Sequence, residues 1–257
     1  MPAKRLSPAV LAARKRLRRR RRRAVLTILL LVLLVMGGFA VYQSDYFLVE
    51  RIEIHGLNKI TAEEVKQVSG IESQMLIWRV QSGELERKIK SQLPRVDSVK
   101  VTKRLPDLVA IQLVERIDAA LLPHPDGGWL VIDATGMPID FVDQYPGNNL
   151  PIINGLKLQN DVPLGRPMNV KGLDTVMLVV NSFARNGAPI VSEIIYDEHD
   201  SVTIFTQAGL PVYFGSDGSW DLKVQALLGI LEDLRARNAQ ARYIDLRSVY
   251  RPVLREK

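Results

Sequence analysis

The distribution of hydrophobic and polar positions separates the chain into one long apolar segment and two regions of mixed, periodic character. Residues 24–41 carry no charged side chain. A helix of this segment spans roughly 27 Å at about 1.5 Å per residue, close to the roughly 30 Å hydrocarbon core of a bilayer. The pattern therefore predicts a transmembrane helix over residues 24–42, and Tyr42, Tyr46 and Phe47 suit the membrane interface that follows it.

The charge distribution adds an orientation to this prediction. Residues 1–23 contain 11 lysine and arginine side chains and no acidic one, whereas the rest of the chain has 24 basic against 28 acidic side chains. The isoelectric point near 9.7 therefore arises from the tail, and no nucleic-acid-binding surface is indicated beyond it. Because basic flanks remain in the cytoplasm, we expect a single-pass type II protein whose tail contacts anionic lipid. A cleaved signal peptide is the alternative, since Gly38 and Ala40 have the small-residue spacing of a cleavage site.

Residues 47–116 show the periodicity of a small α+β unit. A strand that alternates apolar and polar residues comes first, and Thr61 and Glu64 then have the spacing of a helix capping box. A second helix is predicted after Ser82, because apolar residues recur there at every fourth position. Two alternating strands on either side of a turn at residues 105–107 complete the predicted order β-α-α-β-β.

Residues 117–250 predict a mixed, largely antiparallel β domain with flanking helices, and residues 251–257 are left as a C-terminal tail. Two helices are expected, one starting near Leu173 and one capped by Ser219. The chain as a whole is therefore predicted to be α+β, with a single transmembrane helix before its two domains. Strands are expected at residues 129–133, 151–155 (as a short edge), 193–197, 202–206, 211–215 and 242–248.

Several stretches resemble a known family of bacterial proteins. Residues 47–56 (FLVERIEIHG), residues 96–107 (VDSVKVTKRLPD) and the pair Glu115-Arg116 resemble a POTRA domain. Residues 128–136 (GWLVIDATG) and 243–247 (YIDLR) resemble recurrent stretches of FtsQ/DivIB, the bitopic cell-division family. The resemblance implies a divisome scaffold in the inner membrane at the division septum, with its POTRA and β domains in the periplasm.

The resemblance also implies partners and a binding region. In this family the C-terminal strand region receives a periplasmic segment of FtsB within a complex with FtsL, while FtsK, FtsW and FtsI are linked to the region near the POTRA domain and membrane. A terminal strand at a sheet edge has unpaired backbone groups to which a partner strand can bind. The alternative is an internal strand with Arg247 merely solvated. The partner-binding residues expected by this resemblance are Tyr243, Asp245, Arg247, Ser248, Val249 and Tyr250.

Residues that would indicate catalysis or metal binding are scattered. The chain contains no cysteine, and its three histidines, His55, His124 and His199, fall in separate segments. Residues 215–218 are rich in glycine but lack the lysine and spacing of a phosphate-binding loop. The carboxylates Asp133, Asp140 and Asp143 were the candidates for a hydrolase pair, but Asp133 falls at a strand–turn boundary, where aspartate is common. We therefore expect no enzymatic activity, no cofactor and no metal.

Two other classes of envelope protein remain as alternatives. A POTRA-containing protein of outer-membrane assembly or secretion would carry repeated POTRA units or a long β-barrel, for which the roughly 140 residues after the first unit are too few. A membrane-anchored envelope hydrolase would require catalytic groups that converge on one site.

Overall fold

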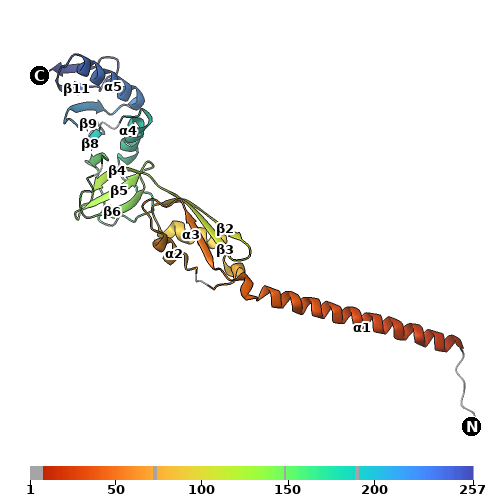
Figure 1. The fold of residues 1–257 in the computed structure, drawn as a ribbon. Helices are drawn as coiled ribbons and strands as arrows, with labels where there is room; N and C mark the ends of the chain where they lie inside the picture. Colours follow the sequence, from red (N-terminus) through yellow and green to blue (C-terminus); the bar gives the residue numbers. More distant parts are fainter. Residues whose placement is uncertain (1–7, 72–73, 148, 189–190, 257) are drawn as a thin grey trace, which may run out of the picture. The chain divides into compact units, whose positions relative to one another are not determined.

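The computed structural model describes residues 8–71, 74–147, 149–188 and 191–256 (Figure 1). The side chains of residues 8–20 and Ala24 lie outside this description. The expected lipid contacts of the basic tail fall largely on those residues. The chain forms two compact units, described separately below. The smaller unit runs to Glu53 and adds Ile71–Ser82 and Val101–Ile111, and the larger unit comprises Ile54–Gly70, Gly83–Lys100 and the chain from Gln112 onward.

Helix α1 (Pro8–Tyr42) contains the predicted transmembrane segment. Its large apolar side chains from Val25 to Val41 are 48–71% exposed. Among the described residues, the stretch Arg21–Tyr42 is the one helix long and apolar enough to cross a membrane. Two short 3-10 helices also belong to the smaller unit, η1 (Asp45–Phe47) and η2 (Ile77–Arg79).

The predicted β-α-α-β-β order is confirmed. Strands β1 (Arg51–His55), β2 (Val96–Arg104) and β3 (Leu108–Glu115) form a sheet in the order β1-β3-β2, and helices α2 (Ala62–Ser69) and α3 (Ser82–Gln92) lie between β1 and β2 in the chain. The capping box is present in full, because the Thr61 hydroxyl accepts from the Glu64 N–H at 3.2 Å and the Glu64 carboxylate accepts from the Thr61 N–H at 2.7 Å. Both bonds are local, which is why the sequence spacing reveals them.

A nine-stranded sheet fills most of the larger unit, in the order β12-β11-β10-β9-β8-β7-β4-β5-β6. Pairing is parallel between β10 and β11, between β7 and β8, and between β4 and β7, and the remaining pairs are antiparallel. The strands are β4 (Asp118–Pro123), β5 (Trp129–Asp133), β6 (Pro138–Val142), β7 (Ile152–Asn154), β8 (Val191–Tyr196), β9 (Val202–Thr206), β10 (Pro211–Gly215), β11 (Ala241–Asp245) and β12 (Val253–Glu256).

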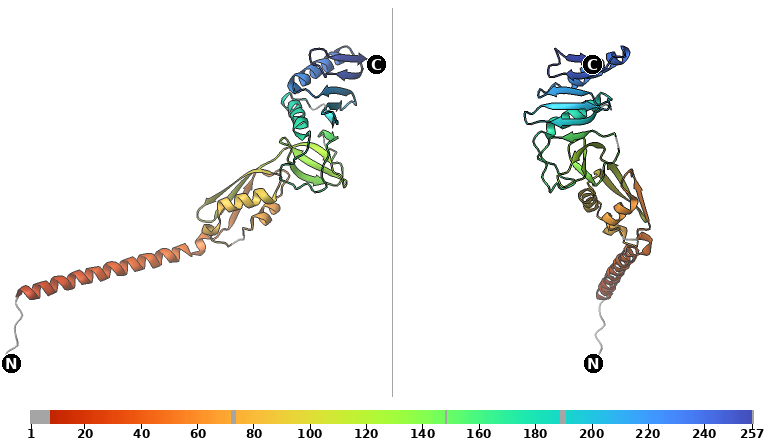
Figure 2. Two further views of the ribbon diagram at one scale, coloured as in Figure 1. Left: turned by 180° about the vertical axis from the view of Figure 1, so that it is seen from behind. Right: turned by 90° about the vertical axis from the view of Figure 1, so that its left-hand side faces the viewer.

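The main hydrophobic core lies between this sheet and helices α4 (Leu173–Arg185) and α5 (Trp220–Ala236). Both helices cover the same face of the sheet (Figure 2). Their apolar positions recur at helical spacing, and Val176 and Val224 are fully buried in a cluster that also contains strand residues such as Ile244. A smaller cluster that includes Leu121 and Val131 covers part of the opposite face.

Three expectations about the β domain are wrong. Strand β7 is not a short edge, because it pairs with β4 on one side and β8 on the other. Ser219 occupies the N-cap position of α5, but its hydroxyl donates to Asp217 at 2.9 Å and makes no capping bond. Residues 253–256, expected within a tail, form strand β12, which pairs with β11 and thereby makes β11 an interior strand. The strand corrections concern pairings between distant segments, which local periodicity does not specify.

Candidate functional site

The C-terminal end of the nine-stranded sheet contains the predicted partner-binding residues. In β11 and just beyond it, Ile244 and Leu246 are fully buried, as the predicted alternation requires. The side chains of Tyr243 and Asp245 therefore point to the face opposite helices α4 and α5. The register places Tyr243 beside Arg255 of β12, and places Asp245 between Tyr213 of β10 and Val253 of β12.

This outer face combines aromatic and charged side chains. The rings of Tyr213 and Tyr243 meet edge to face with their centroids 5.9 Å apart. The chain after β11 continues with the exposed residues Arg247 and Ser248 and the half-buried Val249. Tyr250 follows with 88% of its surface exposed. The structure thus brings the six predicted residues together on β11 and the connection to β12.

Arg247 does not present a free positive charge. Its Nη2 lies 2.6 Å and its Nε 3.0 Å from one carboxylate oxygen of Asp245. The hydrogen bond from this guanidinium holds the pKa of Asp245 below its ordinary value, although partial burial of the carboxyl opposes the shift. A partner carboxylate would have to share Arg247 with Asp245 or displace it.

The open edge of the sheet belongs to β12 rather than to β11. Strand β12 pairs antiparallel with β11, and within the described residues no strand pairs with its other side. Leu254 is half-buried against the main core, whereas Val253 is 51% exposed. Glu256 receives a hydrogen bond of 3.1 Å from Arg237 at the end of α5, which ties the last described residue to the helix.

A buried lysine, which sequence reasoning missed, supports this end of the sheet. Lys223, in the first turn of α5, is fully buried. Its ammonium donates to the carbonyl oxygen of Phe214 in β10, lies 3.4 Å from the carbonyl oxygen of Arg247 and forms an ion pair with Asp217. It is also 5.4 Å from the ring centroid of Trp220. The ammonium thereby links the end of β10, the loop before α5 and the chain after β11.

The sequence contains only a weak signal for this lysine. A buried ammonium requires a hydrogen-bond acceptor for each donor, and two of those found here are backbone carbonyls, which carry no residue-specific signal. The third acceptor, Asp217, lies in the glycine-rich turn 215–218, which indicated only the start of a helix.

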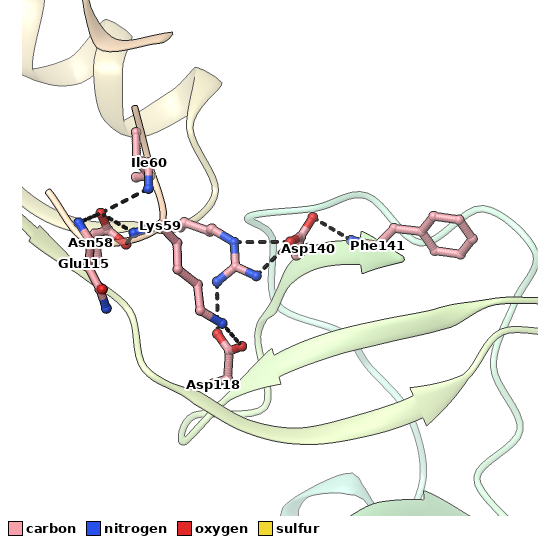
Figure 3. Close-up of polar contacts among 8 residues, drawn as sticks. Asn58, Lys59, Ile60, Glu115, Asp118, Asp140 and Phe141 are labelled. Carbon is pink, nitrogen blue, oxygen red and sulfur yellow. Dashed lines mark hydrogen bonds and ion pairs between the residues drawn. The ribbon is translucent and has the colours of Figure 1, made fainter. Parts of the chain in front are cut away.

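A second polar network, within the larger unit, surrounds the start of β4 (Figure 3). The carboxylate of Glu115 accepts three backbone N–H groups, from Asn58 at 2.6 Å, Lys59 at 2.9 Å and Ile60 at 3.1 Å. Burial raises the pKa of Glu115, but these three hydrogen bonds outweigh it and the pKa lies below its ordinary value. The side chain of Lys59 in turn donates to Asp118.

Two arginines complete this network. The guanidinium of Arg95 donates to Asp118 at 2.8 Å and to Asp140 at 2.6 Å. The guanidinium of Arg116 donates to Asp133 at 2.7 Å. Both arginine side chains are largely buried, with 15% and 12% of their surfaces exposed. In the pair Glu115-Arg116, noted above only as a family marker, Glu115 therefore holds the loop before α2 and Arg116 binds the end of β5.

Two of the three aspartates considered for a hydrolase, Asp133 and Asp140, are bound by these arginines instead. Asp133 is 4% exposed, and one of its oxygens accepts from the Thr135 hydroxyl at 2.6 Å and from the Met137 N–H at 3.0 Å. Burial raises the pKa of Asp133, but the hydrogen bonds from Thr135 and Arg116 outweigh it and the pKa is lowered. Asp140 is bound by Arg95, and Asp143 is exposed. No group of three metal-ligating side chains occurs among the described residues.

Comparison with known proteins assigns both halves of the chain to one family. A family model described as "POTRA domain, FtsQ-type" matches residues 47–116, and one described as "Cell division protein FtsQ/DivIB, C-terminal" matches residues 120–247. The chain is 29% identical over 206 residues to the cell division protein FtsQ of Streptomyces venezuelae, covering 77% of this chain and 72% of that protein. It is 28% identical over 221 residues to FtsQ of Geotalea daltonii, covering 81% of this chain and 77% of that protein.

A relative with the alternative family name also matches. The cell division protein DivIB of Clostridium botulinum is 24% identical over 213 residues, covering 81% of each chain. The two family models are contiguous apart from three residues and follow the apolar helix in the order that the sequence predicts. This chain belongs to the FtsQ/DivIB family of bacterial cell-division proteins.

Proposed function

We propose that this protein is a non-enzymatic scaffold of the division machinery that binds a strand of a partner protein at the open edge of β12. The observation that carries the proposal is that β12 pairs only with β11 among the described residues. An edge strand offers unpaired N–H and C=O groups, and strand addition uses them for affinity while alternate side chains provide selectivity. The binding edge is thus one strand further along the chain than the sequence predicted.

The residues around β12 fit an added strand. A strand that pairs with β12 would lie beside Val253 and Arg255 on the outer face and beside Leu254 on the core face. Tyr250, which is 88% exposed, supplies an apolar contact at the start of this edge. The residues proposed to bind the partner remain Tyr243, Asp245, Arg247, Ser248, Val249 and Tyr250, to which β12 is added as the pairing strand.

The family resemblance supplies the identity of the partners. We assign the added strand to FtsB, in a complex that includes FtsL, and place contacts with FtsK, FtsW and FtsI near the POTRA domain and the membrane. The proposed organisation is a cytoplasmic tail of residues 1–23 on anionic lipid, a span of residues 24–42, a POTRA domain of residues 47–116 and a β domain from residue 117 that extends through β12. The excess of basic residues before the span supports a periplasmic location for both domains at the septum.

The experiment is a titration of the periplasmic FtsB segment against the full chain in detergent micelles. Tyr250→Ala and removal of residues 253–257 should each weaken binding at least tenfold, because one removes an exposed side-chain contact and the other the pairing strand. Leu222→Ala is the matched control, since Leu222 is 50% exposed on α5 and away from the outer face of the sheet. Unchanged affinity in both folded variants would exclude strand addition at β12.

A further inference from the structure

Four aromatic side chains of the smaller unit pack together at the C-terminal end of helix α1, where the chain leaves the apolar segment. Tyr42, the last residue of α1, stacks on Trp78 of η2 with the ring centroids 5.7 Å apart and the planes 10° apart. Phe47 lies 5.0 Å from the same indole ring, and Tyr46 meets Phe47 edge to face at 5.2 Å. The helix end is therefore packed against a segment distant in sequence rather than joined to it by a free linker.

The depth of this aromatic cluster in the membrane follows from the position at which the apolar part of α1 ends. The exposed apolar stretch of α1 runs to Val41, so that Tyr42 and the residues packed on it lie where the hydrocarbon core gives way to headgroups. Tyrosine is enriched at this level, because its ring is apolar and its O–H group is polar. Tyr42 and Tyr46 are still 50% and 68% exposed, which leaves half or more of their surfaces for contact with lipid.

The turn between β2 and β3 lies at the same end of the smaller unit. Asp107 in this turn accepts from the Glu50 N–H at 3.1 Å, and its carboxylate binds Arg51 at 2.8 Å. Lys103 donates to the carbonyl of Val80 at 3.0 Å, two residues beyond Trp78. Figures 1 and 2 both show this turn at the end of the three-stranded sheet from which α1 leaves.

The tip of this turn exposes one large apolar side chain. Leu105 is 60% exposed and follows the exposed Lys103 and Arg104. A large exposed apolar residue at a turn is unremarkable alone. The turn lies at the same end of the unit as the aromatic cluster, however, so that Leu105 supplies a second apolar point there.

We propose that this membrane-proximal surface, formed by Tyr42, Tyr46, Phe47, Trp78 and Leu105, docks on the headgroup layer of the bilayer that α1 enters. The occupant is lipid because the surface is continuous with the apolar helix. Docking at two points, the helix exit and the β2–β3 turn, fixes the membrane-proximal part of the POTRA domain against the bilayer plane. It acts independently of the strand addition proposed above.

Charge attraction does not drive this docking. Beyond α1, the charged side chains described in the smaller unit balance, and Arg51 is already paired with Asp107. Docking should therefore depend on the aromatic and apolar contacts and not on anionic lipid. The basic members are Arg51, Arg79, Lys103 and Arg104, and the acidic members are Asp45, Glu50, Glu53 and Asp107.

The absence of cysteine from the chain permits a direct test. Leu105→Cys and Val114→Cys are each labelled with an environment-sensitive fluorophore, and the full chain is reconstituted in nanodiscs with spin-labelled lipid. Val114 is the matched control, because it is 53% exposed on β3 and lies about 20 Å further along that strand than its first residue, Leu108. We expect quenching at residue 105 to exceed that at residue 114 at least threefold.

The lipid composition and a second variant complete the test. The excess of quenching at residue 105 over residue 114 should be the same in phosphatidylcholine and in its mixture with phosphatidylglycerol. Trp78→Ala should reduce this excess at least twofold. A denaturant titration of Trp78→Ala identifies any general loss of folding, in which case Tyr46→Ala, at an exposed position, replaces it. Equal quenching at the two labelled positions would overturn the proposal, and an excess seen only with phosphatidylglycerol would overturn its apolar basis.

Discussion

The arginine–aspartate pairs at the start of β4 and at the end of β11 use the same chemistry in opposite environments. Arg116 and Asp133 pair at 2.7 Å with 12% and 6% of their side-chain surfaces exposed. Arg247 and Asp245 pair at 2.6 Å, but the Arg247 side chain is 69% exposed. Breaking a buried pair leaves a charge without solvent, whereas an exposed pair exchanges readily with water. Burial thus separates a structural ion pair from one that a partner can reach.

Arg116→Ala should give the largest loss of stability, about 3 kcal/mol, because it leaves Asp133 buried without its cation. The Nε of Arg116 is buried without a hydrogen-bond partner among the described residues. Because the substitution also removes this unsatisfied donor, we place the loss of stability at the lower end of the usual range. Urea denaturation of the full chain in detergent, followed by tryptophan fluorescence, measures it. Arg247→Ala is the control and should cost much less than Arg116→Ala, because solvent screens the exposed pair. Equal losses would show that burial does not distinguish the two pairs.

Lys223→Met should cost about 2 kcal/mol, because the carbonyl oxygens of Phe214 and Arg247 lose the donor that the buried ammonium supplies. The amide of Leu246, which bonds to the carbonyl of Tyr213 at 2.8 Å, should then exchange faster with deuterium. Hydrogen exchange with mass spectrometry measures this local effect. Lys157→Met, at a position with a 90% exposed side chain, should change neither quantity. An unaltered exchange rate at Leu246 would mean that Lys223 does not hold the chain after β11.

Asp133→Asn should cost about 1–2 kcal/mol at neutral pH, because the amide is a weaker acceptor for Arg116 and Thr135. The folded-state pKa of Asp133 is lowered. Its carboxylate therefore contributes stability above the unfolded pKa of about 3.9, and this contribution is lost as the pH falls through the lower folded-state pKa. The difference between wild type and variant should shrink below about pH 4. Asp143→Asn, at an exposed position, should show no such difference, and a constant gap for Asp133→Asn would refute the assignment.

Arg247→Glu should have the smallest effect on stability, because the Arg247 side chain is exposed and its charge is screened by solvent. Its effect should appear in binding, since the substitution places a like charge beside Asp245 and removes the exposed cation that pairs with it. Affinity for the FtsB segment should fall, and the loss should diminish at high salt because screening weakens exposed charges. A large loss of stability with unchanged affinity would reverse the comparison between the two pairs.

Local features of the fold could be predicted from the sequence. The capping box of Thr61 and Glu64 spans four residues, and the alternation of buried and outward residues in β11 spans five. Both follow from the fixed geometry of helices and strands. The contacts of Arg116 with Asp133 and of Arg95 with Asp140 connect residues 17 and 45 positions apart, and no periodicity reports them.

At the candidate site, too, local patterns did not reveal how distant segments pair. The sequence predicted a binding region that contains Tyr243 and Tyr250, but it assigned the sheet edge of that region to β11, which is an interior strand. Whether β11 is an edge depends on the pairing of β12 across an intervening turn, a contact that residues 253–256 gave no clear pattern to reveal. The same holds for β7, whose three residues are too few to show which strands flank them.

The sequence by itself determined the apolar span, the order of elements in the POTRA region and the family, because these depend on local composition and spacing. Only the tertiary structure decided which strand leaves an open edge, which charges are buried and what packs on the end of the span. These properties arise from contacts between distant segments, which no local pattern of residues specifies. Examples are the backbone carbonyls that accept from Lys223 and the packing of Trp78 on Tyr42.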